Sequence, residues 1–300
     1  MKVLFYSNIP SPYRVDFYNE LGKRCDLTVL FELQKSTERD ENWKHEEFQN
    51  FKGIILKGIR LKTDGAFCPG VIKYLNNKYD IIVLTVLASP TALLAVTYLR
   101  MMKIPYCFEG DGGFVVATTG IKAKLKRFVL SGARACFSTS GEFDRYCEAF
   151  GAAKEHIYRY PFTSVTQKDV LETPVTIDEK KILRDKLDIS EEKVVLSVGQ
   201  FIHRKGFDLL LQVAKNVPEG IGVYIVGGTP TEEYLYLKKQ LNVPNVHFLP
   251  FMSKEDLRQY YQASDVFAFF TREDIWGLVV NEAMANGLPV ISTNRCIAAM

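Results

Sequence analysis

The stretch REDIWGLVVNEAMANGLPVI, from Arg272 to Ile291, has the pattern of a loop, a helix and a strand. It begins with charged residues, turns at a glycine, continues as a helix-like run and breaks at Asn-Gly before an apolar strand. A helix that starts near Gly277 has an apolar face made of Val280, Ala283, Met284 and Gly287. Glu282 points away from that face. Because helical side chains tilt toward the N-terminus, its carboxylate can reach a diol that lies over the helix start.

The start of this helix has the chemistry of an anion site, since its first amides lack partners within the helix and its dipole favours negative charge. The amides of Gly277, Leu278 and Val279 would face a diphosphate. Asp274, in the preceding loop, would face the group that the phosphate carries. Taken alone, a carboxylate followed by a loop and a helix is more often a capping arrangement, so the rest of the second half has to decide between the two interpretations.

Short apolar runs rich in β-branched residues alternate with longer helical patterns along the whole chain. In the first half these runs are Val3–Tyr6, Leu27–Phe31, Ile54–Leu56, Ile81–Thr85, Tyr106–Phe108, Ala135–Thr139 and Ile157–Tyr160. In the second half they are Val194–Val198, Gly222–Val226, Val246–Leu249, Val266–Phe270 and Pro289–Ser292. Continuous apolar strands between helices are typical of a parallel sheet that is covered on both faces.

A charged, strand-poor stretch separates the two series, and one helix is expected within it near Asp178–Lys186. We therefore predict the α/β class, with two Rossmann-like, doubly wound domains that face a cleft. The N-terminal domain covers residues 1–165, a linker covers 166–192 and the C-terminal domain covers 193–300. The second series stops directly after a strand, which would leave one sheet face without helices. The sequence thus predicts that the C-terminal domain is incomplete.

The composition is that of an ordinary globular protein. Of its 300 residues, 47% are hydrophobic and 24% are charged, so the chain can form real cores. A net charge of +3 is too balanced for a nucleic-acid-binding protein. Six cysteines are scattered without a Cys-x-x-Cys pair, which favours reduced thiols and a cytoplasmic protein over a disulfide framework.

The run IIVLTVLASPTALLAVTYL, Ile81 to Leu99, is nearly free of charge and long enough to span a bilayer. Ser89 and Pro90 divide it in the middle, with β-branched residues before them and alanines and leucines after them. Ser is a good N-cap and Pro fits the first helical position, so a strand, a turn and a helix are predicted here rather than a membrane span.

Two further loops of the second half follow strands, where open α/β sheets bind their ligands. In GQFIHRKGFDLLL, Gly199 permits a tight turn, and Arg204 and Lys205 place two cations before Gly206 and a helix start. Cations beside a helix N-terminus suit a phosphate, although a solvated charged loop is the alternative. In VGGTPTEEY, Gly227 permits close approach of a ligand or serves as a turn residue.

Together these residues resemble the retaining glycosyltransferases of family 4, which have two Rossmann-like domains in the GT-B arrangement. REDIWGLVVNEAMANGLPVI resembles the family's signature of two acids, and VGQFIHRKGFDLLL resembles its phosphate loop. FLPFMSKEDLRQYYQASDVFAF resembles the intervening stretch that holds the nucleotide base, which would place Phe251 beside the base. The family usually continues beyond this endpoint, in line with a truncated domain.

The resemblance implies a role for each matching residue. Glu282 would bind the ribose hydroxyls, and Lys205, helped by Arg204, would bind the diphosphate. Asp274 would touch the donor sugar, with support from the amides of Gly277, Leu278 and Val279. Two departures affect donor specificity: Asp274 replaces the commoner Glu, and Gln200 stands where the family usually has Arg.

The first half would bind the acceptor. Arg14, on the helix after the first strand, lies near the presumed cleft, with a solvated surface Arg as the alternative. Glu109 and Asp111 follow a strand in EGDGGF, where the family often has a His. Either carboxylate could hold an acceptor hydroxyl and assist in removing its proton, or the Asp-Gly-Gly run could simply form a turn.

Neither a metal nor another cofactor is predicted. His45, His156, His203 and His247 do not cluster, HEEF is not a zinc helix and no Asp-x-Asp motif ends a strand. A basic amphipathic stretch is predicted to contact an anionic membrane surface, or to be a plain surface helix. Its cations are Lys122, Lys124, Lys126 and Arg127.

The predicted activity is that of a retaining glycosyltransferase of the hexosyltransferase class. It would move a sugar from a UDP- or GDP-type donor to a saccharide or lipid-linked saccharide, in the synthesis of cell-surface polysaccharide. The protein would be cytoplasmic, or peripheral on the inner face of the plasma membrane. The alternatives are a nucleotide-sugar 2-epimerase of the same architecture, and an inactive protein that only binds nucleotide.

Overall fold

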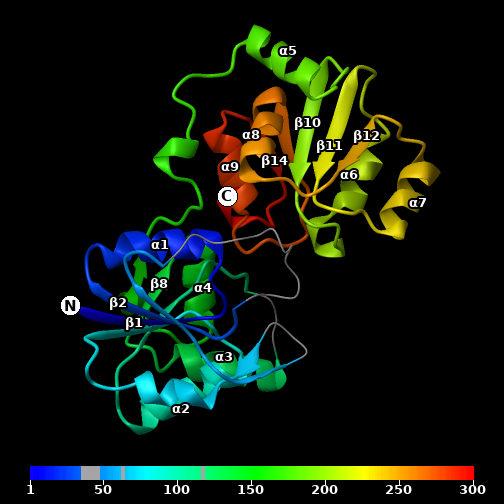
Figure 1. The fold of residues 1–300 in the computed structure, drawn as a ribbon. Helices are drawn as coiled ribbons and strands as arrows, with labels where there is room; N and C mark the ends of the chain where they lie inside the picture. The colour runs from blue at the N-terminus through cyan, green and yellow to red at the C-terminus, as the bar shows by residue number, and fades with distance from the viewer. Residues whose placement is uncertain (35–47, 62–64, 116–118) are drawn as a thin grey trace. The chain divides into compact units, whose positions relative to one another are not determined.

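The computed structural model describes residues 1–34, 48–61, 65–115 and 119–300. The chain forms two compact units, Met1–Phe162 and Thr163–Met300 (Figure 1). Each unit has its own parallel sheet and its own hydrophobic cores.

The first unit is built on a seven-stranded sheet with the order β3-β2-β1-β6-β7-β8-β9, and all of its strand pairs are parallel. Its strands are β1 (Lys2–Ser7), β2 (Asp26–Phe31), β3 (Lys52–Ile55), β6 (Ile81–Leu84), β7 (Cys107–Glu109), β8 (Ala135–Ser138) and β9 (Ile157–Arg159). Every strand expected for this half is therefore found, within a residue or two. A short antiparallel pair of strands, β4 (Ile59–Arg60) and β5 (Ala66–Phe67), was not predicted.

Helices cover both faces of the first sheet, because the strands are apolar on both sides. Alternate residues of β1 belong to different cores: Leu4 and Tyr6 face one, and Val3 and Phe5 face the other. The helical elements of this unit are α1 (Pro12–Gly22), η1 (Pro69–Tyr74), α2 (Pro90–Met101), α3 (Gly120–Leu130), α4 (Gly141–Ala149) and η2 (Lys154–His156). The packing confirms the doubly wound arrangement expected from the continuous apolar strands.

The apolar run from Ile81 to Leu99 folds as a strand, a turn and a helix, as its Ser-Pro pair predicts. The Ser89 hydroxyl caps α2 by accepting a hydrogen bond from the amide of Ala92 at 3.0 Å, and Pro90 is the first helical residue. In the described part of the chain, no helix combines the length and the apolar character needed to cross a membrane.

The second unit repeats the same strand order in a five-stranded parallel sheet, β12-β11-β10-β13-β14. Its strands are β10 (Lys193–Val198), β11 (Ile221–Val226), β12 (Val246–Leu249), β13 (Val266–Phe269) and β14 (Val290–Ser292). Its helical elements are η3 (Gln167–Asp169), α5 (Ile177–Lys186), η4 (His203–Lys205), α6 (Phe207–Ala214), α7 (Glu232–Leu241), α8 (Lys254–Ala263), α9 (Leu278–Ala285) and η5 (Ile297–Ala299).

Both faces of the second sheet are covered, which differs from the expectation of a bare face. Leu196 and Phe267 face a core with residues of α8 and α9, whereas Val223 and Ala268 face a core with α6 and α7. At the edge of the sheet, Ile291 of β14 is 55% exposed.

The stretch expected to be a linker, residues 166–192, belongs to the second unit. Its helix α5 is held to the start of β13 by Asp265, whose carboxylate accepts hydrogen bonds from Arg184 at 2.7 Å and Lys180 at 3.2 Å. Asp265 also accepts the amide of Val194 at 2.9 Å, so one carboxylate joins α5, β10 and β13. The charged composition of residues 166–192 predicted a solvated linker. In the structure, Lys180 and Arg184 of this stretch instead bind Asp265 and hold α5 against the sheet.

Replacing Asp265 tests this anchor. Burial raises the pKa of Asp265. The Val194 amide, Arg184 and Lys180 lower this pKa by a larger amount, so the net pKa of Asp265 is below its usual value. Its stabilising effect is therefore complete above the ordinary aspartate pKa of about 3.9 and is lost as the pH falls through the lowered value. Asp265→Asn should lower the free energy of unfolding by about 2 kcal/mol at pH 7 in urea titrations.

The matched control is Asp185→Asn on the exposed face of α5, which should change the unfolding free energy little. Equal stability of Asp265→Asn and the unmodified chain at pH 7 would show that α5 is not anchored in this way.

Candidate functional site

The strand order of the second unit brings two predicted loops together. The order reverses between β10 and β13, and in open α/β sheets ligands bind beyond the carboxyl ends of the strands at such a point. The loop after β10 contains Gly199 and η4, and the loop after β13 runs from 270 to Gly277. Residues far apart in the sequence therefore meet at the sheet edge where a ligand is expected.

Backbone hydrogen bonds fasten these two loops to each other. The carbonyl oxygen of Arg204 accepts the amide of Arg272 at 2.9 Å and the hydroxyl of Thr271 at 3.0 Å. The Arg204 guanidinium donates to the carbonyl of Glu273 at 2.7 Å. Arg272 in turn makes a two-pronged ion pair with Asp208, at 2.6 and 2.5 Å, which lowers the pKa of Asp208. The position of η4 is thus fixed from several sides.

Lys205 and Asp274 form an ion pair at the centre of this junction. Their charged atoms are 2.5 Å apart, and both side chains are mostly buried, at 13% and 15% exposure. The Lys205 ammonium also lies 5.3 Å from the centre of the Phe269 ring. Arg204 is 44% exposed and stands 4.0 Å from Asp274, so it supplies a second, more accessible cation. Arg204 and Lys205, predicted to bind the diphosphate, therefore lie next to Asp274, predicted to contact the donor sugar.

The glycines of these loops are required by close backbone approach. A Cβ at Gly227 would lie 1.8 Å from the carbonyl oxygen of Gly199, so only glycine lets the loops after β10 and β11 pack together. Gly206 has a φ of +70°, and a Cβ there would lie 2.0 Å from the carbonyl of Phe270. The close approach of Gly227 to Gly199 fits the alternative of a turn residue, and the predicted contact of Gly227 with a ligand stays a prediction.

Helix α9 begins as predicted. Gly277 is its N-cap, with a φ of +90°, and Leu278 and Val279 are its first helical residues. Val280 and Ala283 are buried, but Met284 is 58% exposed and Gly287 is exposed, so the predicted apolar face is narrower than expected. Residues of the last turn that face the core, such as Ala283, are buried, whereas Met284 faces solvent.

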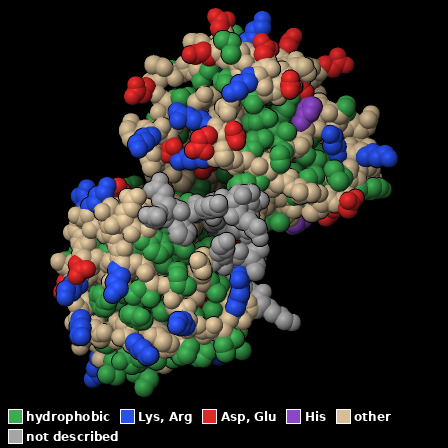
Figure 2. Space-filling model, in the orientation of Figure 1, with side chains coloured by type: hydrophobic (Ala, Val, Ile, Leu, Met, Phe, Trp, Pro, Cys, Tyr) green, Lys and Arg blue, Asp and Glu red, His purple; other side chains and the backbone are tan. Residues whose placement is uncertain are grey.

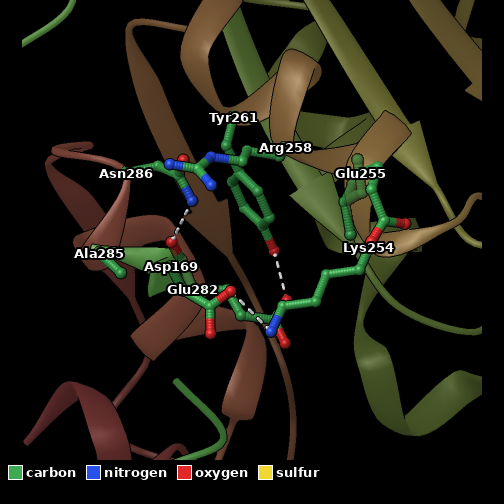
Figure 3. Close-up of a pocket in the computed structure, with 9 residues that line it drawn as sticks. Asp169, Lys254, Glu255, Arg258, Tyr261, Glu282, Ala285 and Asn286 are labelled. Carbon is green, nitrogen blue, oxygen red and sulfur yellow. Dashed lines mark hydrogen bonds and ion pairs between the residues drawn. The ribbon is translucent and has the colours of Figure 1, made fainter. Parts of the chain in front are cut away.

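Glu282 lines a pocket between α8, α9 and residues that precede α5 (Figure 3). Its carboxylate accepts a hydrogen bond from the Tyr261 hydroxyl at 3.1 Å, and Figure 3 shows that hydroxyl directed toward it. Burial raises the pKa of Glu282, against smaller opposite effects of Tyr261 and Lys254. A ligand with hydroxyl donors would therefore stabilise the charged form of Glu282 in this pocket.

The other residues of this pocket were not named individually, although several lie in the stretch Phe248–Phe269 that was predicted to hold the nucleotide base. They are Asp169, Lys254, Glu255, Leu257, Arg258, Tyr261, Ala285 and Asn286. A signal was present, because Lys254, Arg258 and Tyr261 recur at helical spacing and so share one face of α8. Phe251, which was predicted to contact the base, is 41% exposed and does not line the pocket.

The first unit contains a second cluster of the predicted residues. The Arg14 guanidinium donates to Glu109 at 2.8 Å and also pairs with Asp111. The alternative of a solvated Arg14 is wrong, since the residue is only 5% exposed. Burial alone would lower the pKa of Arg14, but Glu109 and Asp111 raise it to a net value above normal.

Glu109 and Asp111 differ in their access to solvent. The Glu109 side chain is 3% exposed and is bonded by Arg14 and the Tyr160 hydroxyl, whereas the Asp111 side chain is 26% exposed. The Tyr13 hydroxyl donates a hydrogen bond to Asp111 at 3.4 Å. Burial, and to a smaller extent the charge of Glu109, raise the pKa of Tyr160. Of the two predicted acids, only Asp111 is placed to meet a ligand directly.

The basic stretch predicted to contact a membrane forms α3. Its Val129 and Leu130 are buried in the core, so most of its apolar face is already used. Lys122, Lys124 and Arg127 are exposed, whereas Lys126 lies over the rings of Tyr146 and Phe150, 5.1 Å from each centre. On the face drawn in Figure 2, basic side chains are spread over the first unit with few acidic ones.

Among the residues that the structure describes, no group of three or more His, Cys, Asp or Glu is placed to hold a metal ion. His45 and most of the HEEF run lie outside the described residues. His247 pairs with Glu191 at 2.7 Å and stacks on Tyr224, which gives it a packing role on the sheet.

Comparison with known proteins supports the predicted resemblance. Residues 179–299 match the family model described as glycosyl transferases group 1. An uncharacterized glycosyltransferase of Haemophilus influenzae is 38% identical over 117 residues, which are 37% of this chain and 32% of that protein. The lipopolysaccharide glucosyltransferase WaaG of Escherichia coli is 30% identical over 125 residues, 40% of this chain and 33% of WaaG. The matches thus span about a third of the length of these curated relatives.

Solved structures with the same fold cover the whole chain. HepE from Anabaena, in complex with UDP-glucose, has a TM-score of 0.75 at 16% identity and matches 100% of this chain and 82% of its own. A crystal structure of WaaG has a TM-score of 0.71 at 16% identity, with the same coverage. At this identity the similarity concerns the fold, and it confirms the GT-B class of α/β architecture.

Replacing Glu282 should reveal the cost of holding a carboxylate in the pocket. Because its pKa is raised in the folded state, the native protein binds the proton more tightly than the unfolded chain. Glu282 therefore costs no stability below the ordinary glutamate pKa of about 4.3 and lowers stability as the pH rises through the raised value. Glu282→Gln should melt at a higher temperature than the unmodified chain at pH 7 and at the same temperature at pH 4.

The control for this comparison is Glu233→Gln on the exposed first turn of α7. A melting temperature of Glu282→Gln that is lower at pH 7, with the same difference at pH 4, would contradict the assigned environment of Glu282.

Proposed function

We propose that this chain is a retaining glycosyltransferase that uses a nucleoside-diphosphate sugar, because residues 179–299 match the model of the glycosyl transferases group 1 family. The acceptor is a hydroxyl of a saccharide or a lipid-linked saccharide, in the synthesis of cell-surface polysaccharide. WaaG, one of the relatives, is a lipopolysaccharide glucosyltransferase, and HepE is a neighbour in fold that was crystallised with UDP-glucose. The HepE complex favours a UDP-type donor, with a GDP-type donor as the other candidate.

The junction at the carboxyl ends of β10 and β13 is the observation that carries this proposal. Lys205 and Asp274 meet there, directly before the first turn of α9, and Glu282 follows on the next turn of the same helix. A diphosphate at the start of α9 would be bound by free amides, by Lys205 and by the more exposed Arg204. Glu282 would then bind the ribose hydroxyls.

Asp274 has two tasks in this proposal. Without a ligand it balances the charge of Lys205 and holds its ammonium near the helix start. When a diphosphate arrives, the phosphate oxygens take over as the partner of Lys205, and the Asp274 carboxylate becomes available to a hydroxyl of the donor sugar. A charge-assisted contact to a sugar hydroxyl is stronger than a neutral one, so this exchange favours an activated sugar over free phosphate.

The chemistry would depend on position and electrostatics. The bond from the sugar to the diphosphate breaks, the acceptor oxygen attacks the same face of the sugar, and negative charge develops on the leaving phosphate. Lys205, Arg204 and the amides of Leu278 and Val279 would stabilise that charge. These groups supply positive charge where a divalent ion would otherwise act, so we propose that no metal is required.

The acceptor would bind to the first unit beside Asp111. Its carboxylate is partly exposed and is held by Arg14 and Tyr13, so it is oriented to accept the acceptor's hydroxyl proton. Arg14 and the buried Glu109 would act as positioning residues for Asp111. This assignment narrows the sequence prediction, which left Glu109 and Asp111 as equal candidates.

We also propose that the protein is cytoplasmic and peripheral on the inner face of the plasma membrane. The exposed cations Lys122, Lys124 and Arg127 and the 76% exposed Ile121 lie on α3. Because the apolar face of α3 packs on the core, the contact would be mainly electrostatic and sensitive to salt.

Thermal-shift assays with UDP-, GDP- and ADP-sugars test the donor site. A ligand at about a hundred times its Kd should raise the melting temperature by about 5–10 °C. Glu282→Ala should abolish that shift, whereas the control Glu233→Ala on α7 should keep it. The site assignment fails if no nucleotide shifts the folded protein or if Glu282→Ala responds like the unmodified chain.

Product analysis separates transfer from the alternative of 2-epimerisation. A glycosyltransferase should release nucleoside diphosphate and form a new glycoside only when a saccharide acceptor is added, with the anomeric configuration of the donor retained in the NMR spectrum. Conversion of the donor into its C2 epimer without any acceptor would identify an epimerase, and binding without turnover would identify a non-catalytic protein.

Vesicle sedimentation tests the membrane contact. Each cation near an anionic surface contributes about 1 kcal/mol, so Lys122→Gln with Lys124→Gln should lower the partition coefficient on phosphatidylglycerol vesicles by about 30-fold. The matched control is Lys238→Gln with Lys239→Gln on α7. Equal binding by both double variants would contradict a role for α3.

A further inference from the structure

The pocket at Glu282 has a wall that comes from outside the sheet and its helices. Residues 163–171, here named the connecting segment, follow directly on Phe162, the last residue of the first unit. Asp169 of this segment lines the same pocket as Glu282 (Figure 3). The segment therefore joins the two units along the chain and at the same time borders the site that the proposed function assigns to the ribose.

Three contacts hold the connecting segment across α8 and α9. Asp169 makes an ion pair with Lys254, at the start of α8, at 2.8 Å. Arg258, one turn later on α8, donates to the carbonyl of Lys168 at 3.3 Å. The amide of Leu171 donates to the carbonyl of Ala285, at the end of α9, at 2.9 Å. The contacts surround the pocket, so the segment spans it from one helix to the other.

Asp169 is itself held in place by the segment. One of its carboxylate oxygens accepts the amide of Thr166 at 2.8 Å and the Thr166 hydroxyl at 2.9 Å, which caps η3. The other oxygen is left to bind Lys254. Burial alone would raise the pKa of Asp169, but hydrogen bonds from Lys254 and Thr166 outweigh it and lower the net pKa. The carboxylate therefore stays charged at neutral pH and fixes the ammonium of Lys254.

We propose that Asp169 is a positioning residue of the nucleotide site, which acts through Lys254 and closes the connecting segment over the ligand. The inference rests on the proposed function, because it takes the ligand to be a nucleoside diphosphate whose ribose lies on Glu282. Lys254 has three donor hydrogens, so it can keep its bond to Asp169 and donate another to the nucleotide. Bound nucleotide would then stabilise the segment that connects the two units.

The test compares Asp169→Asn with Glu172→Gln, an exposed residue three positions further on. The side-chain amide introduced by Asp169→Asn retains an oxygen for Thr166 but lacks the charge that binds Lys254. Because this ion pair is partly exposed, Asp169→Asn should raise the Kd of UDP or GDP, measured by calorimetry, by about two- to fivefold. Glu172→Gln should leave the Kd unchanged.

Two further measurements distinguish positioning from a general loss of structure. In a Lys254→Met background, Asp169→Asn should have no further effect on the Kd, because the two residues act as a pair. Hydrogen–deuterium exchange of peptides from 163–171 should be faster in Asp169→Asn, and UDP or GDP should slow it in the unmodified chain.

The proposal is overturned by an unchanged Kd and exchange rate in Asp169→Asn. It is also overturned if the Lys254→Met background shows the full effect of Asp169→Asn, or if bound nucleotide leaves the exchange of the connecting segment unaltered. An unmodified chain that binds neither UDP nor GDP contradicts the proposed function instead, and is recognised by the absence of a calorimetric signal in every variant.

Discussion

The ion pair between Lys205 and Asp274 is the contact on which the second unit's site depends. A lysine and an aspartate 69 positions apart meet because the strand order places β10 beside β13, and hydrogen bonds of Arg204 and Thr271 fix both loops. Pairing keeps both charges stable in a mostly buried place, where a lone charge would be costly. In the proposed function, this pairing lets Lys205 exchange Asp274 for a bound diphosphate.

Unlike Asp274, whose charge is paired with Lys205, Glu282 has a neutral hydroxyl as its hydrogen-bond partner. Its carboxylate is partly buried with a tyrosine hydroxyl as its direct partner, and its pKa is raised. We expect this environment to lower the stability of the folded chain at neutral pH, a cost that a ligand with hydroxyl donors would offset. Such a residue is better explained by binding than by folding. The connecting segment borders the same pocket through Asp169, so the proposed donor site would draw on the two loops, α9 and this segment.

The sequence was sufficient to predict the strands, the doubly wound layers and the start of α9, because apolar β-branched runs, Ser89-Pro90 and Gly277 have local physical causes. It did not predict the anchoring of residues 166–192 to the second unit. Charges in such a stretch are as typical of a solvated linker as of anchoring contacts, and only the fold brings Asp265 to α5. The burial of Arg14 was missed for the same reason, as its partners Glu109 and Asp111 lie 95 and 97 positions away. The stretch that contains Lys254, Arg258 and Tyr261 was expected to hold the nucleotide base, but only the fold places these three residues around one pocket with Glu282.

In the proposed mechanism, the diphosphate of an activated sugar replaces Asp274 as the partner of Lys205. A crystal structure with a bound nucleoside diphosphate tests this directly. We expect phosphate oxygens within hydrogen-bond distance of the Lys205 ammonium and of the first amides of α9, and ribose hydroxyls on Glu282. A nucleotide bound elsewhere, with the Lys205–Asp274 pair intact and Glu282 still bonded only to Tyr261, would contradict it.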